Sequence, residues 1–365
     1  MATNQEIYSD LPIPPGEYLE ELIEELGMTK DELAKRMNRP APKLSAIFKG
    51  DKAITPDTAL ELEKVVGVPA HVWTGLEAEY RLALARRHHD EEQKHLEKES
   101  PLVKSFPYVQ LVKLGVVAKR TRPTEKAMEL QRFFGVASLN TVLNLRRYQA
   151  AFRSGKKDRS PEAVAAWLRI GELQAQRMRC APFQKRRLKD SLEAVRAMTL
   201  QYPEDFQENL HHLLADSGVA LVLCSHLPGT YAHGATFWLG RQKAVVMLTL
   251  RYKWADVFWF SLFHELGHIL FHNRQAVILE GDNADPVQKP LEDEADQFAA
   301  NTLIPPKPCA AFIKARRFFA EDIQRFAKQV GISTGIVVGR LQKEGHIRPS
   351  WHNSLRMRFE WESSD

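Results

Sequence analysis

The segment His264-Glu265-Leu266-Gly267-His268 carries the spacing that most clearly indicates chemistry in this 365-residue sequence. Residues i and i+4 lie one above the other on a helix face, so the imidazoles of His264 and His268 can share one metal ion, with Glu265 beside them. Imidazole nitrogens suit zinc, and a catalytic zinc also needs a third protein ligand and an open position for water. The segment therefore predicts two ligands of a zinc site. The alternative is that both histidines are core residues of an apolar helix.

An acidic helix predicted over residues 291–303 offers the third ligand. In zincins that use a glutamate ligand, a small residue follows three positions later, and a carboxylate or amide four positions later orients a ligand histidine. Glu292, Ala295 and Asp296 have this spacing. We predict Glu292 as the third ligand and Asp296 as the group that orients a histidine, with Glu294 as the alternative ligand.

His272 continues the histidine stripe but is a poor candidate ligand. The rise of a straight helix carries it about 6 Å beyond His268. The zincin arrangement with a third histidine, HExxHxxGxxH, needs a glycine where this sequence has Phe271. We expect His272 to be a polar residue at the end of the helix.

Such a site predicts peptide hydrolysis. Zinc lowers the pKa of a bound water toward 7 and polarises the scissile carbonyl, and Glu265 is the predicted general base that passes the proton to the leaving amine. Tyr231 and His233, which follow Pro228-Gly229-Thr230, are the candidate oxyanion donors. The alternative for both is a structural role.

Apolar patterning indicates the elements that position these residues. Short apolar runs over 219–223 and 244–250 predict strands, and an apolar helix runs from near Trp254 to about Phe271. Residues 323–344 predict a further helix, turn and helix. We expect this pair to pack against the preceding domain and shape its cleft.

The first 85 residues predict five short helices. Gly27, Gly50 and Gly67 end three of them, and Thr29 with Glu32 forms a capping box. A tight turn joins the second and third helices, as in a helix-turn-helix domain.

The predicted fold class is mainly α with a small α+β part. The length calls for more than one domain. We predict a helix-turn-helix domain of the DNA-binding type over residues 1–86, a basic helical connector over 87–182, a zincin-like α+β metallopeptidase domain over 183–310 and a C-terminal helical extension over 311–365.

The net charge of +5 is unevenly distributed. Residues 1–100 hold 13 basic and 20 acidic side chains, residues 101–200 hold 21 and 7, and residues 201–365 hold 17 and 19. The excess therefore lies in the middle third, where it can neutralise phosphates, pair with the acidic N-terminal domain, or remain solvated. Its clusters are Lys119-Arg120-Arg122, Arg146-Arg147, Lys156-Lys157-Arg159 and Lys185 to Lys189.

Three separated cysteines argue against a disulfide framework or a cysteine-cluster metal site. The N-terminus carries no stretch like a signal peptide, and the most apolar run, Val257 to Phe263, is too short to span a bilayer. We expect a cytoplasmic protein without a membrane partner.

The motifs FHELGHILFH and EDEADQFAANTLIP resemble the ImmA/IrrE family of zinc metallopeptidases over roughly residues 183–310, with Asp296 where that family usually has asparagine. The resemblance implies a gluzincin-like zinc site with His264, His268 and Glu292 as ligands. It also implies cleavage of helix-turn-helix repressors.

The first 85 residues resemble HigA-type antitoxins in MTKDELAKRM, in FKGDKAITPDTALELEKVVGV and in the following Trp73. The recognition helix departs from that pattern, because it starts with Ala41-Pro42-Lys43. Arg39, Lys43, Ser45 and Lys49 remain as candidate contacts to bases or phosphates. The alternative is a helical module for dimerisation or for docking a partner protein.

Together these features predict a transcriptional regulator fused to a zinc-dependent metallo-endopeptidase. Its expected partners are operator DNA and a protein substrate that is a repressor or antitoxin-like, with a toxin partner and a homodimer as further possibilities. The alternative is a non-enzymatic DNA-binding antitoxin or autorepressor with a structural or vestigial metal site. A third is self-cleavage between Arg86 and Ser100.

Overall fold

A computed structural model describes residues 12–87, 89–146, 148, 160–249, 253–272, 278–279 and 289–359. The chain forms two compact units, residues 1–98 and 99–365. Each is described by itself. The domain boundaries predicted at residues 86, 182 and 310 remain predictions.

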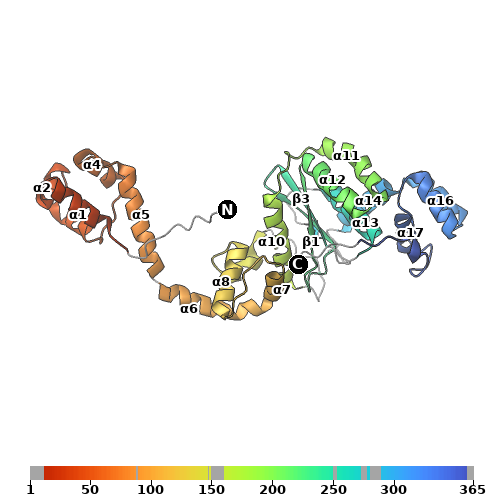
Figure 1. Ribbon diagram of the computed structural model, residues 1–365, viewed down its shortest axis with the longest axis horizontal. Helices are drawn as coiled ribbons and strands as arrows, with labels where there is room; N and C mark the ends of the chain where they lie inside the picture. The colour runs from red at the N-terminus through yellow and green to blue at the C-terminus, as the bar shows by residue number, and fades with distance from the viewer. Residues whose placement is uncertain are drawn as a thin grey trace. The chain divides into compact units, whose positions relative to one another are not determined.

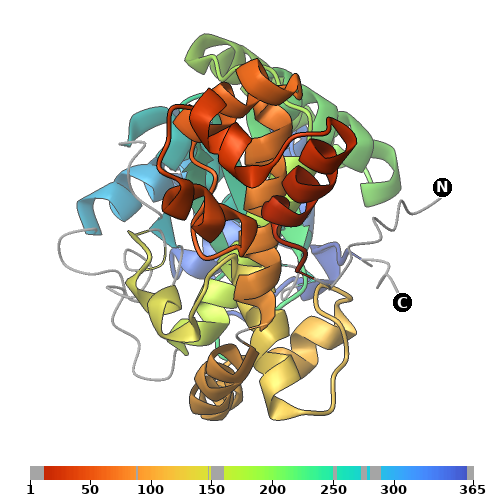
Figure 2. The same cartoon turned by 90° about the vertical axis from the view of Figure 1, so that its left-hand side faces the viewer.

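The first unit contains the five expected helices, α1 (Pro15–Glu25), α2 (Lys30–Arg36), α3 (Ala41–Phe48), α4 (Pro56–Val66) and α5 (Ala70–Arg87), followed by α6 (His89–Glu99). The Thr29 hydroxyl accepts a hydrogen bond from the amide of Glu32 at 3.2 Å, which caps α2 as the sequence predicts. Figures 1 and 2 show α1 to α4 grouped around the N-terminal half of α5. Their apolar faces, from Leu19 to Trp73, form one buried core.

The second unit starts with helical segments that the sequence analysis treated as a connector. They are η1 (Ser100–Ser105), α7 (Tyr108–Lys113), α8 (Pro123–Phe134), η2 (Leu139–Asn144) and α10 (Pro161–Arg177). Glu99 is buried here and accepts hydrogen bonds from the amide of Leu139 and from Nε2 of Gln131, both at 2.9 Å. The part of the predicted connector that begins at Glu99 is therefore packed into the second unit.

A four-stranded sheet lies at the centre of the second unit, in the order β1-β3-β2-β4. Strands β1 (Val219–Cys224) and β3 (Lys243–Thr249) are the two predicted ones and pair in parallel. Strands β2 (Gly234–Leu239) and β4 (Ile278–Leu279) were not predicted, and β2 pairs antiparallel with both β3 and β4. Strand β2 is buried along nearly its whole length, so it lacks the alternation of polar and apolar residues that marks a half-buried strand.

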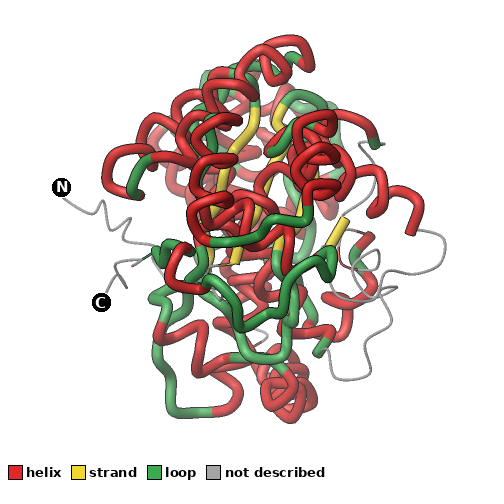
Figure 3. Tube along the Cα trace, turned by 90° about the vertical axis from the view of Figure 1, so that its right-hand side faces the viewer, coloured by secondary structure: helices red, strands yellow, loops and turns green. Residues whose placement is uncertain are grey.

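Helices cover both faces of this sheet (Figures 1 and 3). Alternate residues of β1 and β3, such as Leu221 and Val246, join one core with α11 (Lys185–Ala197), α12 (Pro203–Asp216) and α13 (Ala255–Phe271). Helix α10 contacts β1 and β2 but contributes nothing to that core, so it covers the other face. A short 3-10 turn, η3 (Met198–Leu200), links α11 to the loop before α12.

The chain ends with α14 (Lys289–Leu303), α15 (Pro306–Ala315), α16 (Ala320–Val330), α17 (Thr334–Lys343) and η4 (Asn353–Leu355). Ile336, Val337, Val338 and Leu341 of α17 lie in the same core as α13. The guanidinium of Arg340 donates to the carbonyls of Ala300 and Ile304, at 2.9 and 3.2 Å, and so holds the C-terminal end of α14. The helix pair expected over 323–344 thus helps to position α14.

The fold is mainly α with a small α+β part, as the sequence predicts. Among the residues described, no helix has both the length and the apolar character needed to cross a bilayer.

Candidate metal centre

Helix α13 carries the HExxH segment through the core of the second unit. Apolar residues surround it on all sides, a pattern typical of a buried helix. His264 and His268 are each 2% exposed, and Glu265 is fully buried. Polar side chains in such a place need partners, because burial without them costs free energy.

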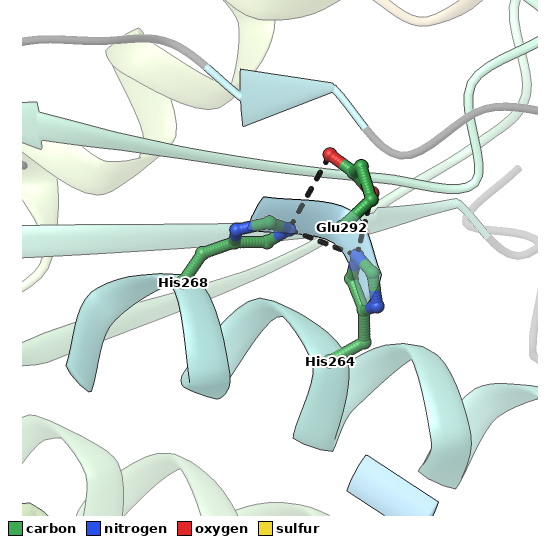
Figure 4. Close-up of side chains that lie close together, drawn as sticks. All are labelled: His264, His268 and Glu292. Atoms are coloured by element: carbon green, nitrogen blue, oxygen red, sulfur yellow. Dashed lines mark hydrogen bonds and ion pairs between the residues drawn. The ribbon is translucent and has the colours of Figure 1, made fainter. Parts of the chain in front are cut away.

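Helix α14 brings Glu292 to the two histidines. Oε2 of Glu292 lies 3.1 Å from Nε2 of His264, and Oε1 lies 3.6 Å from Nε2 of His268. The two Nε2 atoms are 2.9 Å apart. Figure 4 shows both imidazoles rising from one helix toward the Glu292 carboxylate. The three side chains therefore converge on one point, with their ligand atoms within 4.8 Å of one another.

Small residues allow the two helices to approach this closely. A Cβ atom on Gly267 would lie 3.0 Å from Cδ1 of Phe298 and 3.3 Å from Cα of Ala295. A side chain at position 267 would therefore require Phe298 or the backbone of α14 to move by a few tenths of an ångström.

Asp296 lies where it orients His264. Its Oδ1 is 2.7 Å from Nδ1 of His264. A carboxylate only accepts hydrogen bonds, so Nδ1 carries the proton and Nε2 presents a lone pair to the centre.

Glu294 and His272 do not join the three converging side chains. Nδ1 of His272 lies 2.7 Å from Nδ1 of His268, and Nε2 of His272 lies 3.2 Å from Oε2 of Glu294. Glu294 thus contacts His272, which lies outside the three converging side chains. This is not the position of a third ligand, the alternative considered for Glu294. His272 ends α13 as expected, yet its side chain is only 3% exposed and contacts a predicted ligand.

Glu265 is held from strand β2. The Thr236 hydroxyl donates a hydrogen bond to Oε2 of Glu265. A Cβ atom on Gly234 would lie 2.3 Å from Oε1 of Glu265, so only glycine leaves room for this carboxylate. Neither contact could be predicted from the sequence, because both depend on strand β2, which was not predicted.

The donor set fits a metal ion. Burial acts to raise the pKa of Glu292, but the imidazoles of His264 and His268 beside the carboxylate outweigh it and lower the pKa to about 2. Burial lowers the pKa of His268 and favours the neutral imidazole that binds metal. Oε1 of Glu292 is buried and accepts no hydrogen bond within the described chain. A carboxylate and imidazole lone pairs that face one another are stabilised by a cation between them.

Comparison with known proteins gives the family of each unit. A helix-turn-helix model matches residues 19–73, and a Peptidase M78 model, described as the IrrE N-terminal-like domain, matches residues 247–342. The HTH-type transcriptional regulator YddM of Escherichia coli (strain K12) is 30% identical over 73 residues, which span 20% of this chain and 78% of that protein. The chain belongs to the helix-turn-helix family. Its second unit carries an IrrE N-terminal-like domain.

Two further proteins are similar to about a quarter of this chain. Virulence-associated protein A of Dichelobacter nodosus is 34% identical over 98 residues, 26% of this chain and 93% of that protein. An addiction module antidote protein of the HigA family from Coxiella burnetii has 36% identity over 23% of this chain and 91% of its own, with a TM-score of 0.21.

The helix-turn-helix unit exposes most of its predicted contact residues. Lys43, Ser45 and Lys49 are exposed on or just after α3. Arg39 instead donates from Nε to Glu61 at 2.5 Å and from Nη1 to Thr58 at 2.8 Å. It therefore ties α4 to the start of α3, which leaves less of its guanidinium for DNA.

The other predicted residues are the candidate oxyanion donors and the basic clusters of the middle third. Tyr231 and His233 lie on the loop before β2, and His233 immediately precedes Gly234. Their role as oxyanion donors remains a prediction. In the basic middle, Arg120 pairs with Glu129 at 2.8 Å, and Lys185 to Lys189 stand on α11. Arg147, Lys156, Lys157 and Arg159 lie outside the described residues.

Proposed function

We propose that this protein is a transcriptional regulator whose IrrE-like domain is a zinc-dependent metallo-endopeptidase that cleaves a specific protein, a repressor or antitoxin-like partner. One observation carries the proposal. His264, His268 and Glu292 converge within 4.8 Å while Glu265, from the same buried helix, is held by Thr236. A purely structural metal site gives no reason to bury an additional carboxylate beside the ligands.

We assign each residue a role that is known from metal-assisted hydrolysis. His264, His268 and Glu292 would hold the zinc, which supplies Lewis-acid chemistry to a peptide carbonyl and an attacking water. Glu265 takes the proton from that water and passes it to the leaving amine. Thr236 and Gly234 keep the Glu265 carboxylate in one orientation. Asp296 keeps His264 in the tautomer that presents Nε2.

Glu265→Gln tests the proposal because the amide keeps the size of the side chain and removes the base. We expect one zinc per chain in both proteins, and cleavage of candidate repressors encoded beside this gene by the wild type alone. Glu208→Gln, a variant at a carboxylate of the same unit whose side chain is 89% exposed, should cleave normally. A wild-type protein that binds no stoichiometric zinc would contradict the proposal. Intact masses from the same incubations would show any self-cleavage between Arg86 and Ser100.

For the first unit we propose operator binding through α3. The match to the helix-turn-helix family and the exposed Lys43, Ser45 and Lys49 support it. Lysines contact phosphates, so their loss should weaken binding to all sequences about equally. In fluorescence anisotropy with DNA from upstream of this gene, Lys49→Ala should reduce the dependence of affinity on salt. An unchanged salt dependence would argue against α3 as the DNA-contacting element.

A second candidate function is a non-enzymatic antitoxin or autorepressor. It is favoured by the length of the relatives, because 73 residues of this chain cover 78% of one relative and 98 residues cover 93% of another. These relatives are therefore much shorter than this chain, and most of their length matches about a quarter of it or less. Two results would favour this function. Glu265→Gln would bind the operator as tightly as the wild type, and no protein encoded beside this gene would be cleaved.

The proposed partners are operator DNA and a protein substrate, and the proposed location is the cytoplasm, where both would be met. The toxin partner and the homodimer remain predictions.

A further inference from the structure

His272 gives the second histidine of the centre a partner that the sequence did not indicate. Among the described residues, no carboxylate contacts Nδ1 of His268, in contrast to His264, whose Nδ1 contacts Asp296. Nδ1 of His268 lies instead 2.7 Å from Nδ1 of His272, and the backbone amide of His272 donates to the carbonyl of His268 at 3.0 Å. The His272 ring, almost fully buried, thus stands between His268 and Glu294.

When both imidazoles are neutral, the hydrogen-bonding groups of His268, His272 and Glu294 allow one arrangement of protons. Glu294 presents a carboxylate, 56% exposed on its side chain, and a carboxylate only accepts hydrogen bonds. Nε2 of His272, at 3.2 Å, must then be the donor to Glu294. A neutral imidazole with a proton on Nε2 has a lone pair on Nδ1, so Nδ1 of His272 accepts from Nδ1 of His268. His268 therefore carries its proton on Nδ1 and leaves Nε2 as a lone pair.

We propose that His272, backed by Glu294, is a positioning residue that fixes the tautomer and ring orientation of His268 toward the metal. The inference rests on the proposed metal centre and deepens it. Each ligand histidine is then oriented by one carboxylate of α14. Asp296 contacts His264 directly, and Glu294 contacts His272, which in turn contacts His268. Partners of this kind typically change metal affinity by about 10- to 100-fold when they are removed.

The first test is independent of metal and of activity. In metal-free protein labelled with 15N-histidine, imidazole chemical shifts report which ring nitrogen carries the proton. We expect His268 to be protonated on Nδ1 and His272 on Nε2. His268 protonated on Nε2 in the wild-type protein would overturn the proposal, whether or not the protein binds zinc.

The second test measures zinc affinity by competition with a chelator. His272→Phe fills the space but accepts no hydrogen bond, and we expect it to weaken zinc binding about 10- to 100-fold. His272→Gln keeps an accepting oxygen and should restore much of that loss. Equal affinities for the wild type and His272→Phe, or equal losses for the two variants, would overturn the proposal.

A matched control comes from another histidine of the same unit. His346 pairs through Nε2 with Oε2 of Glu344 at 3.2 Å, the same distance as between His272 and Glu294, and lies outside the metal centre. His346→Phe should bind zinc as the wild type does. A wild-type protein without zinc affinity would refute the proposed function, and the imidazole shifts would still decide the role of His272.

Discussion

The hydroxyl of Thr236 on β2 donates a hydrogen bond to the carboxylate of Glu265 on α13. Both side chains are buried, with Thr236 3% exposed. The contact joins the sheet to the helix at the residue proposed as general base, so it sets where that carboxylate points.

Thr236→Val tests this contact because valine keeps the shape and removes the donor. The loss of a hydrogen bond to a buried charged group costs about 1.5–3 kcal/mol, so we expect cleavage to fall by about 10- to 100-fold. Zinc content should not change. Thr236→Ser, which retains the hydroxyl, should keep most of the activity. Cleavage rates that are the same for the valine variant and the wild type would show that the contact does not position the base.

Gly234→Ala tests the space behind the same carboxylate. The added Cβ would lie 2.3 Å from Oε1 of Glu265, so the carboxylate or strand β2 must move. Overpacking of this kind typically costs about 1–3 kcal/mol of stability, and we expect the cleavage rate to fall further than the melting temperature alone explains. Gly75→Ala on α5, where an added Cβ meets nothing within 4 Å, is the control. Normal cleavage by Gly234→Ala would contradict this expectation.

Asp296 offers a graded test of how His264 is oriented. Asp296→Asn keeps an oxygen that can accept from Nδ1 of His264, so we expect zinc affinity close to that of the wild type. Asp296→Ala removes the acceptor and should weaken zinc binding about 10- to 100-fold. Chelator competition measures both variants. Asp296 has no orienting role if the alanine variant binds zinc as tightly as the asparagine variant.

The stability of the metal-free second unit should depend on pH through two histidines, the buried His268 and the half-buried His211. Burial lowers the pKa of His268 and also that of His211, so the unfolded chain, with histidine pKa values near 6.5, binds protons that the folded state does not. The free energy of unfolding should therefore decrease as pH falls below about 6.5. Glu292, with a pKa lowered to about 2 from 4.5, adds a further loss only below about pH 4.5.

Urea unfolding of the metal-free protein between pH 7.5 and pH 5.5 measures this effect. His211→Asn removes one of the two groups without touching the metal centre and should flatten the dependence. The same slope in His211→Asn and the wild type would exclude His211, and a stability independent of pH would exclude both histidines.

The sequence by itself determined the elements whose patterns are local. The spacing of His264 and His268 placed both imidazoles on one helix face, and the capping box at Thr29 began α2 where the structure has it. Glycine and proline punctuation and apolar periodicity were enough for the five helices of the first unit and for β1 and β3. Each of these signals acts between residues that are close in the sequence, so it does not depend on how distant segments pack.

Only the tertiary structure showed which residues, distant in the sequence, contact the side chains of the candidate metal centre. Thr236 reaches Glu265 across 29 positions, and Glu294 reaches His272 across 22. The packing of β2 against α13, and of α14 against Gly267, sets these contacts. The Glu292 and Glu294 side chains are chemically alike, and the sequence left both open as ligands. In the packed pair of helices, Glu292 contacts Nε2 of His264, whereas Glu294 contacts His272. The packing of α14 against α13 sets the direction of each side chain, and the residue type alone does not.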